Sequence, residues 1–545
     1  MPADFTLRVV ILAAGLLLAG TCEAQGIISR IILQRVETAV DRPLPTVAEV
    51  LGAEPSAVIA PIVAIGFLEN GNPSDQMDWG GAIGWYLMEA ANGAFPDLAI
   101  VSSDQYASDG TVDTGDLAGT RREELQRVAV RNGARFGIAG SIYVRGDQFD
   151  LSLELLAFPA LRQLAVRQQA GALTDLPIAV QALTQELLTE AVAQSPAGGN
   201  PVAGSIAAPA PGELQALAMA FGKANSLSAT EQLALYESLW REHRNFISVA
   251  TPYMMALYVA ASSAEIQYRI PNVLNGSELS LTAKTCGYLM QSETASTGID
   301  PDAVAKLTQL VLANPNSIGT WRALGNAYIN ENVMNPERQA CYTCVPAIDH
   351  HAGYAKAIVL ALEVVRRWPD NYRSWWGLSY SVYWYASLVR GSDYWKDVTE
   401  PRRIRFKELM AVADDCSFEA IHRHPDHATL YANRIPFDVN SGLDRMSSFQ
   451  RAAALAPHSR YVYRMAFGYA RPQWGGSMDD LREIYDVARR NNPGEDWPRQ
   501  LRNASAPEAK PFLDFDNPWV RNGLVAMVVM VLLLGIWRPW SQRRI

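Results

Sequence analysis

The chain has 545 residues, of which 49% are hydrophobic and 19% are charged, a balance typical of folded proteins rather than disordered ones. Because this length exceeds what one compact core usually holds, we expect about two to four structural units. The formal net charge of −9 argues against a nucleic-acid-binding protein, which needs a basic surface to neutralise phosphates.

The N-terminal sequence MPADFTLRVVILAAGLLLAGTCEAQG has the layout of a secretory signal peptide. Arg8 precedes an apolar run from Val9 to Ala19, which is too short to span a bilayer. We therefore expect a signal peptide at residues 1–24, followed by an N-terminal segment at 25–57. Lipid attachment to Cys22 is an alternative, but Thr21 before it fits that signal poorly.

Residues 58–194 alternate between strand-like and helix-like patterns. Strands are predicted at 58–67, 97–103 and 162–169, and helices at 79–95, 121–133 and 174–192. The stretch 135–158 predicts a β-hairpin whose turn is Arg145-Gly146-Asp147-Gln148. Together these elements predict a compact α/β domain.

A stretch rich in proline, alanine and glycine at 195–211 lacks apolar periodicity and is interpreted as a linker. Strand-like patterns disappear after it. Helix starts are marked by a capping box from Ser228 to Glu231 and by Asp300 before Pro301. The region 212–515 is therefore expected to be helical.

Within this helical region the chain repeats itself. Helix-like runs end at prolines, and an aromatic residue follows six positions after each of the first four. The prolines are Pro315, Pro369, Pro425, Pro457 and Pro493, and the aromatic residues are Trp321, Trp375, Tyr431 and Tyr463. Successive prolines are 54, 56, 32 and 36 residues apart. The last two intervals fit one repeat, and the first two fit one repeat plus an insertion of about 20 residues.

These repeated positions resemble the tetratricopeptide repeat, a helix–turn–helix unit of about 34 residues. Trp321, Leu324, Gly325 and Tyr328 fill the four positions that mark the first helix of that repeat. Degenerate later copies keep Trp375, Leu378, Tyr431, Phe449, Tyr463 and Tyr485. The resemblance implies an irregular helical solenoid over 212–515, with a concave surface that binds a protein or peptide.

The segment GARFGIAGSIYVRGDQFDLSLELL at 133–156, with the strand at 58–67 and the helix start Trp79-Gly80-Gly81, resembles the small N-terminal α/β domain of TolB-like proteins. Ala139 stands where that family usually has a charged residue. Together the two resemblances imply a bacterial α+β multidomain protein in the periplasm. Neither family carries a catalytic residue set, so we expect neither enzymatic activity nor a cofactor.

The C-terminal sequence predicts a single transmembrane helix at 518–538 and a cytoplasmic tail at 539–545. Gly523 to Trp537 is uninterrupted and apolar, and three arginines follow it while only Arg521 precedes it closely. This charge difference favours a periplasmic body anchored in the inner membrane. A C-terminal sorting signal that is removed is an alternative.

An exported body meets oxidising conditions, so the candidates for disulfide bonds are Cys286, Cys341, Cys344 and Cys416. An alternative places a metal ion on Cys341 and Cys344 with His350 or His351, which would allow a metal-dependent enzyme in the insertions at 330–430.

A second histidine cluster comprises His422, His424 and His427. Pro425 and Asp426 between them favour a solvated turn over a metal site.

Aromatic residues concentrate near residue 380 beyond what one packing face can hold. The candidates for partner binding are Trp376, Tyr383, Trp384, Tyr385 and Trp395. The predicted function is a periplasmic scaffold that binds a protein or peptide and helps to assemble or stabilise a membrane or envelope complex. A sensor of a small ligand or glycan, lined by the same tryptophans, is the alternative, as is an unusually bulky core.

Overall fold

The structure is a computed structural model that describes residues 22–493 apart from several gaps. The gaps are 41, 57–59, 72–76, 96–97, 103–120, 195–207, 211, 225, 277–278, 295–299, 330–349, 392–397, 442–445 and 472–475. Most of the predicted signal peptide and linker, and all of the predicted transmembrane helix and tail, therefore lie outside the described residues. Among the residues that are described, no helix combines the length and hydrophobicity needed to cross a membrane.

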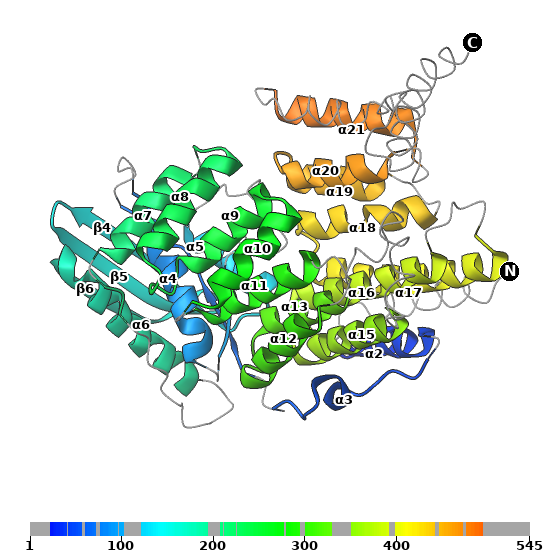
Figure 1. The fold of residues 1–545 in the computed structure, drawn as a ribbon, viewed down its shortest axis with the longest axis horizontal. Helices are drawn as coiled ribbons and strands as arrows, with labels where there is room; N and C mark the ends of the chain where they lie inside the picture. The colour runs from blue at the N-terminus through cyan, green and yellow to red at the C-terminus, as the bar shows by residue number, and fades with distance from the viewer. Residues whose placement is uncertain are drawn as a thin grey trace, which may run out of the picture.

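The protein is a mixed α and β structure in which helices predominate (Figure 1). Its sheet contains β1 (Ile62–Ile65), β3 (Ala99–Ser102), β4 (Phe136–Arg145), β5 (Gln148–Ala157) and β6 (Arg162–Ala172). They lie in the order β3-β1-β4-β5-β6, and the short β2 (Glu69–Asn70) also pairs with β4. The strand β1 runs parallel to β3 and β4, whereas β4, β5 and β6 are antiparallel.

The predicted hairpin is confirmed, because Arg145 and Gln148 form the last pair between β4 and β5. Gly146 in the turn has a φ of 62°, a left-handed conformation that glycine adopts without steric cost.

Three helices cover the two faces of this sheet. They are α4 (Trp79–Ala94), α5 (Arg121–Arg131) and α6 (Leu176–Ala193). Because successive strand residues point to opposite faces, Val63 and Ile65 pack in one hydrophobic cluster with α4 and α6, whereas Ile62 and Ala64 pack in another with α5. Apart from the short β2, these strands and helices are those predicted from the local hydrophobic pattern.

After Gly212, every element in the described part of the chain is a helix. The first group is α7 (Glu213–Ala224), α8 (Ala229–Glu242), α9 (Ala250–Ala260), α10 (Ser263–Leu274), α11 (Leu281–Thr294), α12 (Pro301–Ala313) and α13 (Ile318–Tyr328). The second group is α15 (His350–Arg367), α16 (Tyr372–Arg390), α17 (Glu400–Arg423), α18 (Ala428–Ser441), α19 (Ser447–Leu455), α20 (Arg460–Tyr469) and α21 (Met478–Asn491). Each helix packs against the next one in this series. Figure 1 shows α15 to α21 stacked in chain order.

The repeated interval from proline to aromatic residue has a structural cause. Each aromatic side chain donates a hydrogen bond to the carbonyl of the proline six residues before it, which ties the turn to the helix that follows. The donor–acceptor distances are 2.9 Å for Trp321, 3.1 Å for Trp375, 3.1 Å for Tyr431 and 2.8 Å for Tyr463. The same local device thus recurs in four turns, and membership of the tetratricopeptide family remains a prediction.

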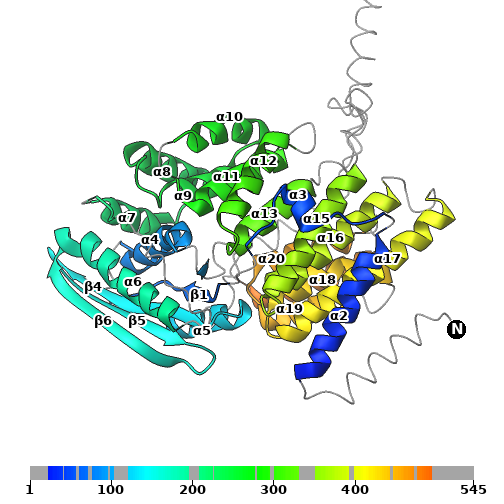
Figure 2. The same cartoon turned by 90° about the horizontal axis from the view of Figure 1, so that it is seen from below.

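The N-terminal segment contains α2 (Cys22–Ala39) and α3 (Val47–Leu51), which the sequence pattern did not predict. Figure 2 shows α2 beside α17. Ser29 donates to Glu419 at 3.0 Å, Arg35 pairs with Asp415, and Arg366 pairs with Glu37 at 2.6 Å. The first described helix is therefore held by residues from the second half of the chain.

The α/β part and the helical part share their interiors. One hydrophobic cluster joins the sheet, α4 and α6 to helices α7 to α11. Hydrogen bonds cross the same boundary: Trp85 donates to the Ser248 carbonyl at 3.0 Å, and Asn371 donates to Asn132 at 3.0 Å. The sequence-based expectation of separate units did not include this continuous packing.

A candidate partner-binding groove lined by aromatic residues

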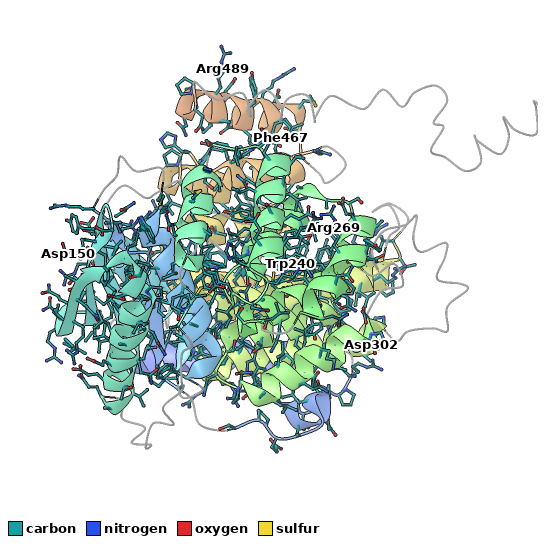
Figure 3. All side chains as sticks on the ribbon, turned by 60° about the vertical axis from the view of Figure 1, so that its left-hand side comes forward. Asp150, Trp240, Arg269, Asp302, Phe467 and Arg489 are labelled. Atoms are coloured by element: carbon teal, nitrogen blue, oxygen red, sulfur yellow. The ribbon has the colours of Figure 1, made fainter. Side chains whose placement is uncertain are left out.

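A groove crosses seven helices of the helical region, from α9 to α20, and encloses about 430 Å³. We call it the aromatic groove, because its lining includes Trp376, Tyr380, Tyr383, Trp384, Phe437, Tyr461 and Tyr469. Elsewhere the described surface carries charged side chains that point outward, such as Asp150, Asp302 and Arg489 (Figure 3).

The helix α16 contributes a continuous row of rings to this groove. Trp376, Tyr380 and Trp384 are spaced four residues apart and so lie on one helical face. The distance between ring centroids is 5.9 Å from Trp376 to Tyr380 and 6.0 Å from Tyr380 to Trp384. Tyr383 continues the row, 5.6 Å from Trp384 and 5.6 Å from Phe437 of α18. These contacts fix the rings in a rigid, partly exposed surface.

Polar groups flank the row of rings. The guanidinium of Arg322 lies 5.2 Å from the centroid of Trp376, a cation–π contact. The hydroxyl of Tyr258 donates to Glu293 at 3.0 Å, and that of Tyr461 donates to Asn433 Oδ1 at 2.5 Å. The Glu293 carboxylate and the Asn433 amide oxygen therefore each accept a hydrogen bond from a tyrosine, and Asn326 adds a second amide to the lining.

Two donors in the lining have no acceptor among the described residues. They are the indole nitrogen Nε1 of Trp384 and the amide nitrogen Nδ2 of Asn433, both shielded from solvent. A buried donor without a partner costs roughly 1–3 kcal/mol. Most buried polar atoms in folded proteins are paired. Among the described residues, unpaired ones also occur outside the groove, including Nε1 of Trp368 and both carboxylate oxygens of Glu89. What matters here is that Trp384 and Asn433 line the groove.

Two glycines leave space in the lining. A Cβ atom added at Gly325 or Gly377 would meet no atom within 4 Å. A larger side chain at Gly377 would therefore occupy the groove rather than clash with the fold.

Burial raises the pKa of the Tyr383 phenol well above its usual value, and the neighbouring Tyr469 adds to this effect. Tyr383 therefore remains neutral at physiological pH, and the row of rings carries no negative charge from it.

The five predicted partner-binding residues do not all lie in the groove. Trp376, Tyr383 and Trp384 line the groove. Tyr385 does not, because the next helical position turns it into the core, where it is 1% exposed and lies 5.8 Å from the ring of His351. This part of the prediction was wrong. Trp395 lies outside the described residues.

Several groove residues come from helices that the sequence did not connect with α16. They are Tyr258, Arg322, Phe437, Tyr461 and Tyr469. The four-residue spacing from Trp376 could have identified Tyr380. The residues from other helices carry no local signal, since only the packing of the helices brings them to one surface.

Cys286 and Cys416 are both free thiols buried in hydrophobic clusters. A disulfide between Cys341 and Cys344 stays a prediction. Burial raises the pKa of Cys286 to about 12, which keeps the thiol protonated and unreactive. Cys341, Cys344 and the side chain of His350 lie outside the described residues. Within the described part of the chain, no cluster of three or more histidine, cysteine or acidic side chains could hold a metal ion.

The turn at His424 to His427 is present, but it is not solvated as predicted. Both histidines are buried, and His424 contacts the carbonyl of Asp370 at 3.1 Å. Burial lowers the pKa of His424 to about 4, so its imidazole is neutral at physiological pH. The cluster is therefore a packed inter-helix turn.

Comparison with known proteins adds no assignment. No protein-family model matches this sequence, and no curated protein is significantly similar to it. The function is therefore inferred from the groove itself.

Proposed function

We propose that this protein is a scaffold that binds a partner protein or peptide in the aromatic groove. The observation that carries the proposal is the row of partly exposed rings on α16, extended by aromatic side chains of α18 and α20. Large aromatic residues are the usual anchors of protein interfaces. A surface that crosses successive helices also suits an extended partner.

The proposal includes export and anchoring, which rest on the sequence. The apolar stretch at 518–538 would tether the body to the inner membrane, and the signal at 1–24 would direct it to the periplasm. A tether raises the effective concentration of the groove for partners on the same membrane face. Such a scaffold would serve to assemble or stabilise a membrane or envelope complex.

A second candidate is a binding site for a small ligand or glycan. The volume of about 430 Å³ falls within the range of roughly 300–1,000 Å³ that small-molecule sites occupy. The seven contributing helices favour an extended peptide over this alternative.

The test is co-purification of the full-length protein after gentle detergent extraction, with identification of retained proteins. The variant Gly377→Met would fill the groove and gain helix propensity, so it should fold normally and lose its partner. The matched control is Gly468→Met on α20, where an added Cβ also meets no atom within 4 Å but the residue lies outside the groove lining.

A partner retained by the wild type and the control but lost from Gly377→Met would support the proposal. Extraction of the protein alone, or equal retention by all three proteins, would contradict it. Saturable quenching of tryptophan fluorescence by a simple sugar, abolished by Gly377→Met, would favour the second candidate.

A further inference from the structure

The polar atoms of the aromatic groove are unevenly matched. The Glu293 carboxylate and Asn433 Oδ1 each accept a hydrogen bond from a tyrosine hydroxyl, whereas the donors at Trp384 Nε1 and Asn433 Nδ2 are unused among the described residues. A ligand that brings carbonyl acceptors would satisfy these two donors. An ordinary extended peptide also brings carbonyls, but it adds one N–H donor per residue, and each of these needs an acceptor of its own.

Building on the proposed function, we propose that the groove binds a proline-rich segment of the partner in the polyproline II conformation. Proline has a carbonyl acceptor but no N–H, so this segment meets the imbalance directly. Its conformation is already extended before binding, which lowers the entropy lost on docking.

The spacing of the rings agrees with this ligand. The centroids of Trp376, Tyr380 and Trp384 lie 5.9 and 6.0 Å apart, and two residues of polyproline II advance about 6.2 Å. Successive rings can therefore contact the ligand at regular intervals. The open space at Gly325 and Gly377 lets its backbone approach α13 and α16 closely.

Both donors belong to residues that line the groove. Trp384 and Asn433 are half-buried side chains whose nitrogen atoms are shielded from solvent. On this proposal, a small side-chain rotation brings each N–H to the ligand, and the hydrogen bond formed on binding favours the rotated state.

The test measures binding of a fluorescent oligoproline peptide of about ten residues to the full-length protein in detergent, by fluorescence anisotropy. A glycine–serine peptide of the same length and cellohexaose are the comparison ligands. The oligoproline should bind at least about tenfold more tightly than the glycine–serine peptide. Trp384→Phe keeps an aromatic ring but removes the N–H, and it should raise the Kd about 3- to 10-fold.

Gly377→Met should abolish oligoproline binding, and Gly468→Met should leave it unchanged, with circular dichroism confirming that both variants fold. Equal binding of the glycine–serine peptide, preference for cellohexaose, or an unchanged Kd in Trp384→Phe would overturn the inference. If oligoproline does not bind but Gly377→Met still loses a co-purifying partner, this inference fails while the proposed function stands.

Discussion

The two faces of α16 carry the same kinds of residue in different surroundings. On one face, Trp375 is 0% exposed and its indole N–H donates to the carbonyl of Pro369 at 3.1 Å. On the other face, Trp384 is half-buried and its indole N–H has no acceptor among the described residues. Tryptophan is therefore structural on the first face and, in our proposal, a ligand-binding residue on the second.

The difference shows how a core aromatic residue can be told from a binding one. Burial separates the two tryptophans of α16, since Trp375 is 0% exposed and Trp384 is half-buried. An unpaired indole N–H is not sufficient on its own, because Nε1 of the core residue Trp368, which is 3% exposed, also has no acceptor among the described residues. The donor of Trp384 becomes informative only together with its place in the groove lining.

The largest predicted effect tests the two faces directly. Trp375→Ala should destabilise the protein by about 3–5 kcal/mol, since it removes a fully buried ring and leaves a cavity. Trp384→Ala should cost no more than about 2 kcal/mol, because part of its surface already faces solvent. Urea unfolding of both variants measures the two costs. Similar losses would show that the faces do not differ as described.

A buried carboxyl outside the groove gives a second test of how burial changes the properties of a polar side chain. Glu89 on α4 is fully buried, and burial raises its pKa from 4.5 to about 7 although the hydroxyls of Ser280 and Thr251 act in the opposite direction. The folded state therefore holds the proton more tightly than the unfolded chain does. Its contribution to stability falls as pH rises from about 4.5 to about 7 and stays level above that.

This pH dependence should disappear in Glu89→Gln, which cannot ionise. The stability of the variant relative to the wild type should increase by about 3 kcal/mol between pH 4 and pH 8. Denaturant unfolding of both proteins across this range measures the difference. A constant difference would mean that Glu89 does not titrate in this window.

The smallest effects concern the repeated hydrogen bond from aromatic residue to proline. Tyr463→Phe removes a partly buried hydroxyl that donates to the Pro457 carbonyl and accepts from Asn491, so it should cost about 1–2 kcal/mol. Tyr431→Phe removes an exposed bond to Pro425 and should cost about 0.5 kcal/mol or less. Thermal unfolding of the two variants compares them. A larger loss of stability in Tyr431→Phe than in Tyr463→Phe would contradict the expectation that the more buried hydrogen bond contributes more.

Local patterns predicted much of the fold. The strands and helices at 58–194 and the capping box from Ser228 to Glu231 were readable because their signals lie within a few residues. The helix α2 was not predicted, because its apolar face at Ile32 and Val36 is short and its partners lie far away in sequence. The continuous packing between the sheet and the helices was not predicted either, because its contacts also join residues far apart in sequence.

The candidate site could be predicted only in part. Helical periodicity places Trp376, Tyr380 and Trp384 on one face and Tyr385 on another, so the error at Tyr385 came from treating adjacent aromatic residues as one group. Phe437 and Tyr469 join the groove through packing between helices, which no local pattern records.

The contact between α2 and α17 has a consequence for the order of folding. Ser29 and Glu419 are separated by 390 positions, so α2 has no docking surface until most of the chain has been synthesised. Contacts this distant in sequence slow folding, because a long loop must close before they form. Closure of α2 onto α17 should therefore be among the last steps, after the helices between them have stacked.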